Sequence, residues 1–439
     1  MLRKEFSRMA FFNPRSPAFP TLSLLGIAAF CLLAPPQARA IPAFARKYDL
    51  KCYSCHTSPP ALNKTGYMFK RLGYRFPPDE MDGTKPAPKI RDLDKDIKFS
   101  VTNSLAMITQ GSFSVNKTTG DTPSSSSSFN LDEMALFIAG AVPDSNFSYF
   151  GHVELSQNGQ TTAAEQAMMI YTAGRANSSY FLRAGMMHMQ EGEGTRAAMM
   201  YNLFPDPSLI LTDVNPLNFS LDQHPVGVAA GYTWASNYFK QIFAVTGKVT
   251  NGLNADGSEI LTGSTKNSKD VWLDADYWFG PDGGLTFMTY HGTKDQIQNQ
   301  GADNEFTYRP VVRRYGAFGN YYFFDHLDVL GGYLRSDDDW MDVPNGTMSR
   351  LTTNAYRGEV DYYFMPGTAA MGRIDYLARK VDGADFGTAR SWGFGALHAL
   401  TERGNVVLRG TYTQERDTDP SFGQPTVSKN FVIDLRVMW

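Results

Sequence analysis

The chain has 439 residues, of which 42% are apolar and 19% charged, and its formal net charge is −3. This composition excludes a disordered, collagenous or coiled-coil chain, and the lack of a basic field argues against nucleic acid as a partner. Three cysteines are too few for a disulfide-built fold. After position 40 no apolar run approaches the roughly 18 residues of a membrane-spanning helix, so insertion into a membrane would require β-strands.

Residues 1–40 are predicted to be a secretory signal peptide. A basic start precedes the apolar run Leu22–Ala34, and Ala38-Arg39-Ala40 ends that run with the small residues of a cleavage site. An uncleaved membrane anchor is the alternative, and the shortness of the run argues against it. Cleavage after Ala40 removes Cys31 and leaves a mildly acidic, exported chain with two cysteines.

The most specific motif is Cys52-Tyr53-Ser54-Cys55-His56, the C-x-x-C-H signature of c-type haem attachment. Two thiols at this spacing can form thioethers to the two vinyl groups of one haem, and His56 then brings an imidazole to the iron. A thioredoxin-like redox pair, a structural zinc site and a plain disulfide are the alternatives. No βαβ pattern surrounds the motif, and the next histidine is the distant His152. The motif predicts one covalently attached c-type haem with His56 as the proximal iron ligand.

Residues 41–80 are predicted to form a small helical haem module. Ser58-Pro59-Pro60 can cap and start a helix, and Gly73 can end it. Met68 borders the apolar face of that helix, and its sulfur is the predicted distal iron ligand, which would raise the haem potential. The alternative is that Met68 only packs against the haem edge. Ligation by two histidines would need an imidazole from the rest of the chain.

A Pro- and charge-rich linker, residues 81–96, separates this module from residues 97–439, where apolar and polar side chains alternate. The clearest alternating segments are Phe147–Ser156, Val271–Phe279, Tyr356–Phe364 and Phe431–Trp439. With apolar side chains outward and polar side chains inward, this pattern is typical of a transmembrane β-barrel. A soluble sandwich would not place so many charges on one continuous face.

Seven short turns and eight longer polar loops divide this region into sixteen strands. The expected turns are Pro143–Asn146, Gly174–Ser179, Ser236-Asn237, Pro281–Gly284, Asp325–Asp328, Met365–Thr368 and Thr401–Asn405. The expected loops are Gly111–Asn130, Gln157–Glu165, Gln190–Gln223, Thr250–Lys269, Lys294–Thr307, Ser336–Leu351, Val381–Thr388 and Asp417–Ser428. Short turns opposite long loops predict an antiparallel outer-membrane barrel with both termini on the periplasmic side.

The barrel offers the small module a place to fold. Sixteen strands enclose a lumen wide enough for water or a plug, and some forty residues are too few to build a stable core alone. Inward-facing polar residues could line or hold the module, or could be solvated pore side chains. These residues are His152, Glu154, Arg183, Asp274, Arg357 and Arg373. The terminal Trp439 resembles the assembly signal of outer-membrane barrels and is also an interfacial anchor.

The N-terminal motifs resemble those of the fused outer-membrane cytochrome–porins of iron-oxidising bacteria. The residues that carry the resemblance are Ile41-Pro42-Ala43-Phe44-Ala45-Arg46-Lys47-Tyr48, Cys52–His56, Pro60-Ala61-Leu62-Asn63 and Gly73-Tyr74. The resemblance implies a monohaem module followed by a sixteen-strand barrel, with haem attachment at Cys52 and Cys55 and proximal ligation by His56. It also implies an electron donor, extracellular Fe(II), and an acceptor, a periplasmic cytochrome or other carrier. It assigns neither a sixth ligand nor an iron-contact site.

Three further clusters stand out in the predicted loops. Met186-Met187-His188-Met189, with Met199-Met200, offers soft ligands for Cu(I) or for the haem, or a Met-rich loop packed inside the lumen. Asp337-Asp338-Asp339 could attract Fe²⁺ in an outer loop or be a solvated acidic run. The run Ser124–Ser128 is expected at a flexible loop tip.

The sequence thus predicts an all-β outer-membrane barrel preceded by a small helical c-type haem module. Its predicted function is oxidation of extracellular Fe(II), with electrons passing through one haem to periplasmic carriers; as an enzyme it would be an oxidoreductase. The alternatives are a diffusion porin with a structural haem, and an electron conduit for another donor or for outward flow.

Overall fold

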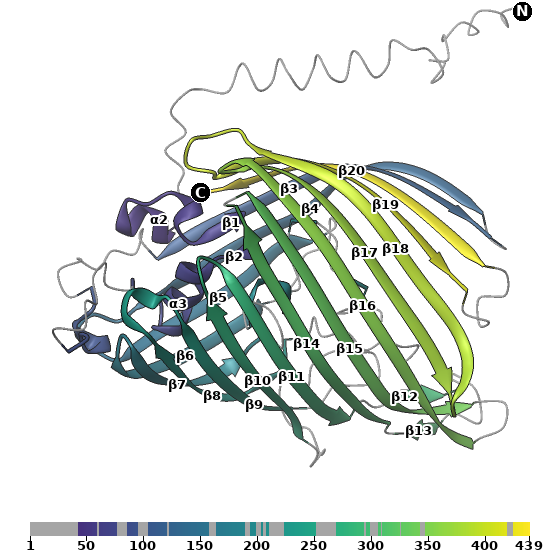
Figure 1. Ribbon diagram of the computed structural model, residues 1–439, viewed down its shortest axis with the longest axis horizontal. Coiled ribbons are helices and arrows are strands. Elements are labelled where there is room, and N and C mark those ends of the chain that lie inside the picture. The colour runs from purple at the N-terminus through teal and green to yellow at the C-terminus, as the bar shows by residue number, and fades with distance from the viewer. Residues whose placement is uncertain are drawn as a thin grey trace, which may run out of the picture. The chain divides into compact units, whose positions relative to one another are not determined.

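Sixteen of the described strands close into one antiparallel barrel (Figure 1). The computed structural model describes residues 43–58, 61–76, 86–94, 104–120, 123–157, 164–188, 194–198, 203–204, 208–209, 224–251, 269–293, 296–298, 306–308, 310–324, 326–342, 347–418 and 425–439. Each barrel strand pairs with the next barrel strand along the chain, and β20 pairs with β3 to complete the ring. The expected sixteen-strand antiparallel barrel is confirmed, whereas the predicted signal peptide lies outside the described residues.

The barrel strands differ in length, and most are longer on the second half of the chain. Their bounds are β3 Leu105–Thr119, β4 Ser124–Ala141, β5 Phe147–Gln157, β6 Ala164–Arg175, β7 Ser178–Met186, β8 Val226–Ala235, β9 Ile242–Asn251, β10 Lys269–Phe279, β11 Gly283–Thr293, β14 Val311–Phe323, β15 Leu327–Asp342, β16 Thr347–Met365, β17 Thr368–Val381, β18 Ala384–Ala399, β19 Val406–Asp417 and β20 Thr426–Met438. A separate hairpin, β12 Gln296–Gln298 with β13 Phe306–Tyr308, lies between β11 and β14 in the chain.

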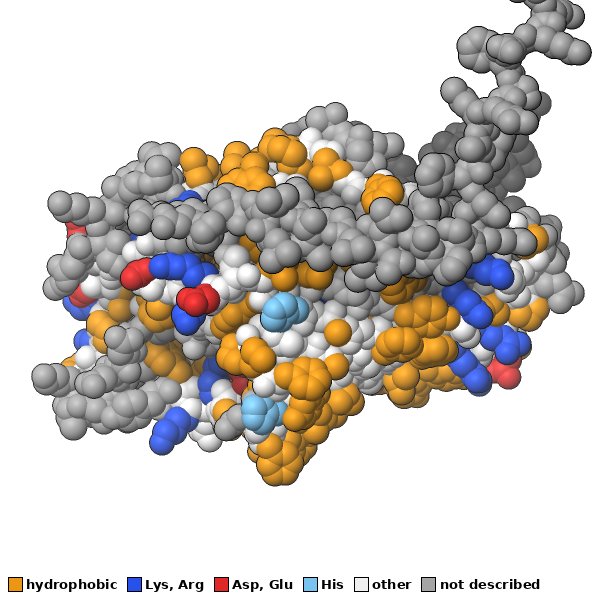
Figure 2. All heavy atoms as spheres, turned by 90° about the horizontal axis from the view of Figure 1, so that it is seen from above, with side chains coloured by type: hydrophobic (Ala, Val, Ile, Leu, Met, Phe, Trp, Pro, Cys, Tyr) orange, Lys and Arg blue, Asp and Glu red, His pale blue; other side chains and the backbone are white. Residues whose placement is uncertain are grey.

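The two faces of the barrel wall carry different side chains. Along β16, Tyr356 and Val360 are exposed, whereas Arg357, Glu359 and Asp361 are buried. In Figure 2 hydrophobic side chains gather over the middle of the face shown, and Lys and Arg lie toward its two ends. The expected alternation, apolar outward and polar inward, is confirmed. No helix among the described residues is both long and apolar enough to cross a membrane.

The tight connections fall where Pro, Gly and Asn predict them. All seven expected short turns join the strand pairs that the sequence assigns to them. At the other end of the barrel, away from these turns, several strands extend further than expected. Ser124–Ser128 lie in β4 and pair with residues of β3, and Asp337, Asp338 and Asp339 lie in β15. The loop positions predicted for these two runs are wrong, because backbone pairing extends the strands whatever the polarity of the side chains.

The residues before the barrel form short elements at its short-turn end, away from β12 and β13 (Figure 1). These elements are α2 Ala43–Tyr48, η1 Cys52–Ser54, β1 His56–Ser58, β2 Ala61–Leu62, α3 Lys64–Arg71 and η2 Ile90–Asp92. We call residues 43–58 and 61–76 the N-terminal segment. Asn63 caps α3 by accepting a hydrogen bond from the Gly66 amide, so this helix begins after the expected Ser58-Pro59-Pro60. Gly73, with φ +68°, follows the end of α3 as predicted.

Part of the connection between β7 and β8 runs through the lumen, and we call its described residues 194–198, 203–204 and 208–209 the lumen segment. The Thr195 amide donates to Thr286 Oγ1 of β11 at 2.7 Å. Farther round the barrel, Arg409 of β19 donates to the Leu203 carbonyl at 3.0 Å. Short 3₁₀ turns, η4 Arg196–Ala198 and η5 Asn237–Phe239, lie in this connection and in the β8–β9 turn. The lumen segment therefore contacts the inner wall on strands from β11 round to β19.

Candidate functional site

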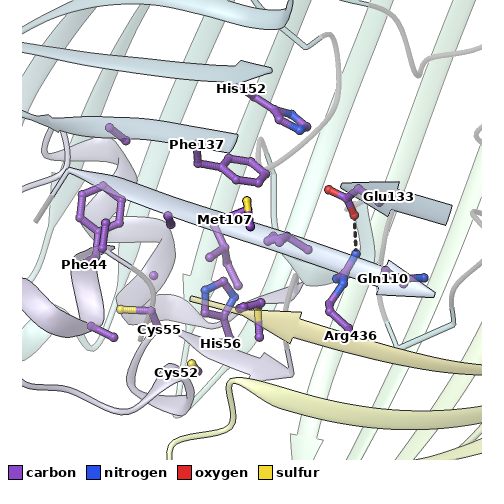
Figure 3. A pocket seen from close by; sticks show the side chains of 18 of the residues that line it. Phe44, Cys52, Cys55, His56, Met107, Gln110, Glu133, Phe137, His152 and Arg436 are labelled. Atoms are coloured by element: carbon purple, nitrogen blue, oxygen red, sulfur yellow. Dashed lines mark hydrogen bonds and ion pairs between the residues drawn. The ribbon is translucent and has the colours of Figure 1, made fainter. Parts of the chain in front are cut away.

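A cavity of about 730 Å³ lies between the N-terminal segment and the barrel wall, and Cys52, Cys55 and His56 all line it. Figure 3 shows these three side chains on one side of the cavity and the labelled residues of β3, β4, β5 and β20 around the rest. The volume falls within the roughly 300–1,000 Å³ typical of small-molecule and cofactor sites. The motif that the sequence singled out thus borders a cavity of suitable size.

The motif is fixed against two short turns of the barrel. The Cys52 amide donates to the Arg403 carbonyl at 3.0 Å. Tyr53 fills the space beside Gly367 and Gly404, where a Cβ atom would approach its hydroxyl oxygen to 2.1 and 2.5 Å. Both glycines also have positive φ, so these turns require glycine for space and for backbone conformation. The side chain between the two cysteines therefore sets the position of the motif.

Helix α3 supports the motif from the other side. A Cβ atom at Gly66 would lie 2.1 Å from the Cys55 carbonyl oxygen, so only glycine allows this approach. The Asn63 side chain also links α3 to the motif, because its Nδ2 donates hydrogen bonds to the Tyr53 and Ser54 carbonyls. The local sequence therefore ties the start of α3 to the turn that holds both cysteines.

Three residues anchor α3 to the barrel through polar contacts. Tyr67 donates to Asp276 Oδ2 of β10 at 2.8 Å. Arg71, which is 2% exposed, donates to Thr233 Oγ1 of β8 and to Thr246 Oγ1 of β9. The Lys64 amide donates to Asp282 Oδ1 in the β10–β11 turn at 2.9 Å. These contacts use buried hydrogen bonds to charged groups, which are among the stronger ones in proteins.

The residues around the cavity fit a covalently bound haem. Cys52 and Cys55 are free thiols, and His56 adjoins them on the same side. Aromatic and aliphatic side chains suited to a porphyrin face complete much of the lining, namely Phe44, Tyr48, Leu62, Phe69, Ile108, Phe137 and Phe150. Burial raises the pKa of both thiols to about 11, so they are protonated at neutral pH.

Met68 is not brought to this cavity. Its side chain is 1% exposed and lies in an apolar cluster with Tyr67, Leu72, Ile90 and Trp278. Among the described residues the cavity lining instead includes Met107, His152, His188 and His224. Distal ligation by Met68 stays a prediction, and its surroundings favour the packing alternative.

A polar group on the barrel wall faces the same cavity, and sequence reasoning recognised only part of it. Glu133, His152 and Glu154 offer ligand atoms that all lie within 4.8 Å of one another. Glu165 Oε2 lies 3.2 Å from His152 Nδ1 and 3.9 Å from His224 Nε2. His152 and Glu154 were expected inward residues. Glu133, Glu165 and His224 carry no local motif. Glu133 lies on β4, Glu165 on β6 and His224 just before β8, so only the fold brings them together.

The other inward residues predicted from the sequence, Arg183, Asp274, Arg357 and Arg373, are also buried, and each contacts another inward side chain. Arg373 pairs with Asp375 at 3.3 Å, Arg357 pairs with Glu359, and Arg314 pairs with Asp338. Asp274 accepts a hydrogen bond from Trp272, and Arg183 lies over the Phe181 ring. These side chains are at most 6% exposed, which contradicts the alternative that they are solvated pore residues, and Arg373 lies over the Phe204 ring of the lumen segment.

The two ligand-rich runs have different surroundings from those expected. Asp337 and Asp339 face Arg335 and Arg313, so guanidinium groups balance the acidic run. Met187 is buried in an apolar cluster, and His188 lines the cavity. Met189, Met199 and Met200 lie outside the described residues.

Neither a family model nor a curated protein matches the chain. Solved outer-membrane barrels do match its fold. OmpT of Vibrio cholerae superposes with a TM-score of 0.51 at 10% identity, covering 76% of this chain and 97% of that one. An anion-selective porin from Comamonas acidovorans gives 0.51 at 10% identity, covering 76% and 99%. OprB of Pseudomonas putida gives 0.52 at 9% identity, covering 76% and 94%.

These likenesses define a class of fold. The chain is a porin-like barrel of the outer-membrane type, and this architecture supports an outer-membrane location. At such low identities the likeness concerns the fold alone.

Proposed function

We propose that the chain is an outer-membrane c-type cytochrome that accepts electrons from extracellular Fe(II) and delivers them to a periplasmic carrier. The observation that carries this proposal is the position of Cys52, Cys55 and His56 on one cavity inside the barrel. The resemblance of the N-terminal motifs to cytochrome–porins supports Fe(II) as the donor.

The chain's own residues have separate tasks in this proposal. A haem attached at Cys52 and Cys55 would supply a one-electron Fe(III)/Fe(II) couple. His56 would bind the iron, and the aromatic lining would exclude water from the macrocycle. Tyr53, Gly66 and Arg71 hold the motif in the barrel mouth. The barrel would keep ferric product outside the periplasm.

Rapid mixing of oxidised, purified holoprotein with Fe(II) near neutral pH tests the proposal. We expect the absorption bands of reduced haem to appear within seconds, followed by reoxidation when a periplasmic cytochrome is added. Haem that stays oxidised under excess Fe(II) but accepts electrons from a reduced periplasmic cytochrome would indicate outward flow. Reduction only by other small donors would indicate a conduit with a different substrate.

A diffusion porin with a structural haem is the second candidate. The likeness to porin barrels supports this candidate directly. None of the solved structures named above is a cytochrome, so they give no such support to the first proposal. The lumen segment argues in the other direction, because its described residues occupy part of the lumen and contact the wall from β11 round to β19. Single-channel conductance of the holoprotein in a planar bilayer separates the two: a porin passes a steady ion current, and a closed conduit does not.

A further inference from the structure

The cavity has a second set of donor groups opposite the cysteine motif. Glu133 on β4 and His152 and Glu154 on β5 place their ligand atoms within 4.8 Å of one another. His152 and Glu154 are buried. One imidazole and two carboxylates form a mixed nitrogen and oxygen donor set, which suits Fe(II), Mn(II) and Zn(II) better than softer or harder ions.

The surroundings of His152 orient its ring as they would orient a metal ligand. Glu165 Oε2 lies 3.2 Å from Nδ1, and the Phe137 ring stacks on the imidazole with centroids 4.2 Å apart. Metal-bound histidines characteristically hold their second ring nitrogen against a carboxylate, which fixes the tautomer and leaves Nε2 for the metal. Glu165 therefore plays the part of an orienting group.

A separate observation points into the same space from the neighbouring strand. Gln110 on β3 is directly opposite Glu133 in the strand register, and its side chain lines the cavity. It is 8% exposed, and among the described residues its Oε1 has no hydrogen-bond partner. A buried carbonyl oxygen of this kind is costly to leave unsatisfied, and a cation or its bound water would satisfy it.

From these observations we propose that Glu133, His152 and Glu154 form a binding site for one divalent first-row transition metal ion, with Gln110 beside it. Arg436 Nη2 lies 3.2 Å from Glu133 Oε2 and competes with the metal for that carboxylate. Figure 3 shows Glu133 and Arg436 next to each other and joined by this ion pair. Fe(II) as the natural occupant rests on the proposed function; the site itself does not.

Titration of oxidised holoprotein in detergent with Mn(II), followed by electron paramagnetic resonance, tests the site without any electron transfer. We expect a single saturable class of bound Mn(II). His152→Ala and Glu154→Gln should each weaken binding by at least roughly tenfold, since loss of an outer-shell partner alone costs this much. Arg436→Met should strengthen it. His291→Ala and Glu402→Gln, which change exposed residues away from the cavity, are the matched controls.

The outcomes separate this proposal from the function. Wild-type holoprotein without saturable Mn(II) binding overturns the site, whatever the variants do. A changed haem spectrum in His152→Ala also overturns it, because His152 would then be an iron ligand of the haem. In holoprotein reduced with dithionite, the haem cannot oxidise Fe(II), so binding can be measured without electron transfer. If added Fe(II) displaces bound Mn(II) under these conditions, the result supports the site. If Fe(II) binds there yet never reduces oxidised haem, the site stands and the proposed function fails.

Discussion

The barrel has two arcs with the same alternation of side chains and different contents. On β14 to β19 the inward charges pair with one another, as Arg314 does with Asp338 and Arg379 with Asp417. On β3 to β6 the inward groups, including His152 and Glu154, face a cavity that the cysteine motif also lines. Period-two alternation therefore determines which residues face the lumen. The neighbour across the strand determines whether they close it or leave a binding site.

Removing both cysteines should have the largest effect, and only on the cavity side. Cys52→Ala with Cys55→Ala leaves no thiol for a thioether, so we expect complete loss of the haem that survives denaturing electrophoresis. The heat-dependent change in gel mobility of the folded barrel should persist. Ser54→Ala is the control and should keep the haem. Haem staining that persists in the double variant contradicts covalent attachment.

Breaking the main ion pairs of the lumen segment should instead destabilise the arc from β14 to β19, where inward charges pair with one another. Arg196 contacts Asp328 and Asp361, all three buried, and Arg196→Met leaves both carboxylates without it. The expected cost is about 3–5 kcal/mol in the free energy of unfolding, with increased conductance in planar bilayers. Arg403→Met removes an exposed pair with Asp49 and should cost at most about 1 kcal/mol. Equal effects of the two variants would mean that the segment does not brace the lumen.

The anchor of α3 should give a pH dependence. Burial, chiefly, raises the pKa of Asp282 to about 6, above its usual value of 3.8. The folded protein therefore binds a proton that the unfolded chain releases, and this group's contribution to stability falls as pH rises from about 4 to about 6. At 1.36 kcal/mol per pKa unit the loss is at most about 3 kcal/mol.

The variant Asp282→Asn keeps an acceptor for the Lys64 amide and cannot ionise. We expect its melting temperature to fall less than that of the wild type between pH 4 and pH 7. Parallel pH profiles for the two proteins would show that Asp282 does not titrate in this range.

Adding a methyl group to α3 where it contacts the cysteine motif should have the smallest effect. Gly66→Ala places a Cβ atom against the Cys55 carbonyl, and overpacking of this kind costs about 1–3 kcal/mol. We expect a lower haem-to-protein ratio in the pyridine haemochrome assay. Gly410→Ala meets nothing within 4 Å and serves as the control. A normal ratio in Gly66→Ala would show that α3 can move away without disturbing the motif.

Much of the fold can be predicted from local patterns in the sequence. Strands such as Val271–Phe279 are visible because period two is a property of one strand, and turns such as Pro281–Gly284 because Pro and Gly have restricted roles. Strand ends at Ser124–Ser128 were missed, since backbone hydrogen bonds extend β4 through residues with weak strand preference. The sequence of Ser124–Ser128 alone does not reveal that this segment pairs with a long neighbouring strand, β3.

The candidate site divides in the same way. Cys52, Cys55 and His56 form a local motif and are recognised directly. Glu133 and Gln110 become neighbours only through the register of β3 with β4, which no short segment reveals. Helical spacing alone predicts Met68 as the distal ligand. The position of α3 in the barrel mouth instead directs this side chain into an apolar cluster.

The ring is completed by β20 and β3, and Gln110 stands opposite Arg436 at this seam. The wall of the cavity is therefore finished only when the last-made strand meets the first. A nascent or truncated chain can carry the cysteine motif and still lack the wall that faces it. Metal binding at Glu133, His152 and Glu154, modulated by Arg436, would thus report on the final step of assembly, and an unfinished barrel would carry the cysteine motif without the proposed metal site opposite it.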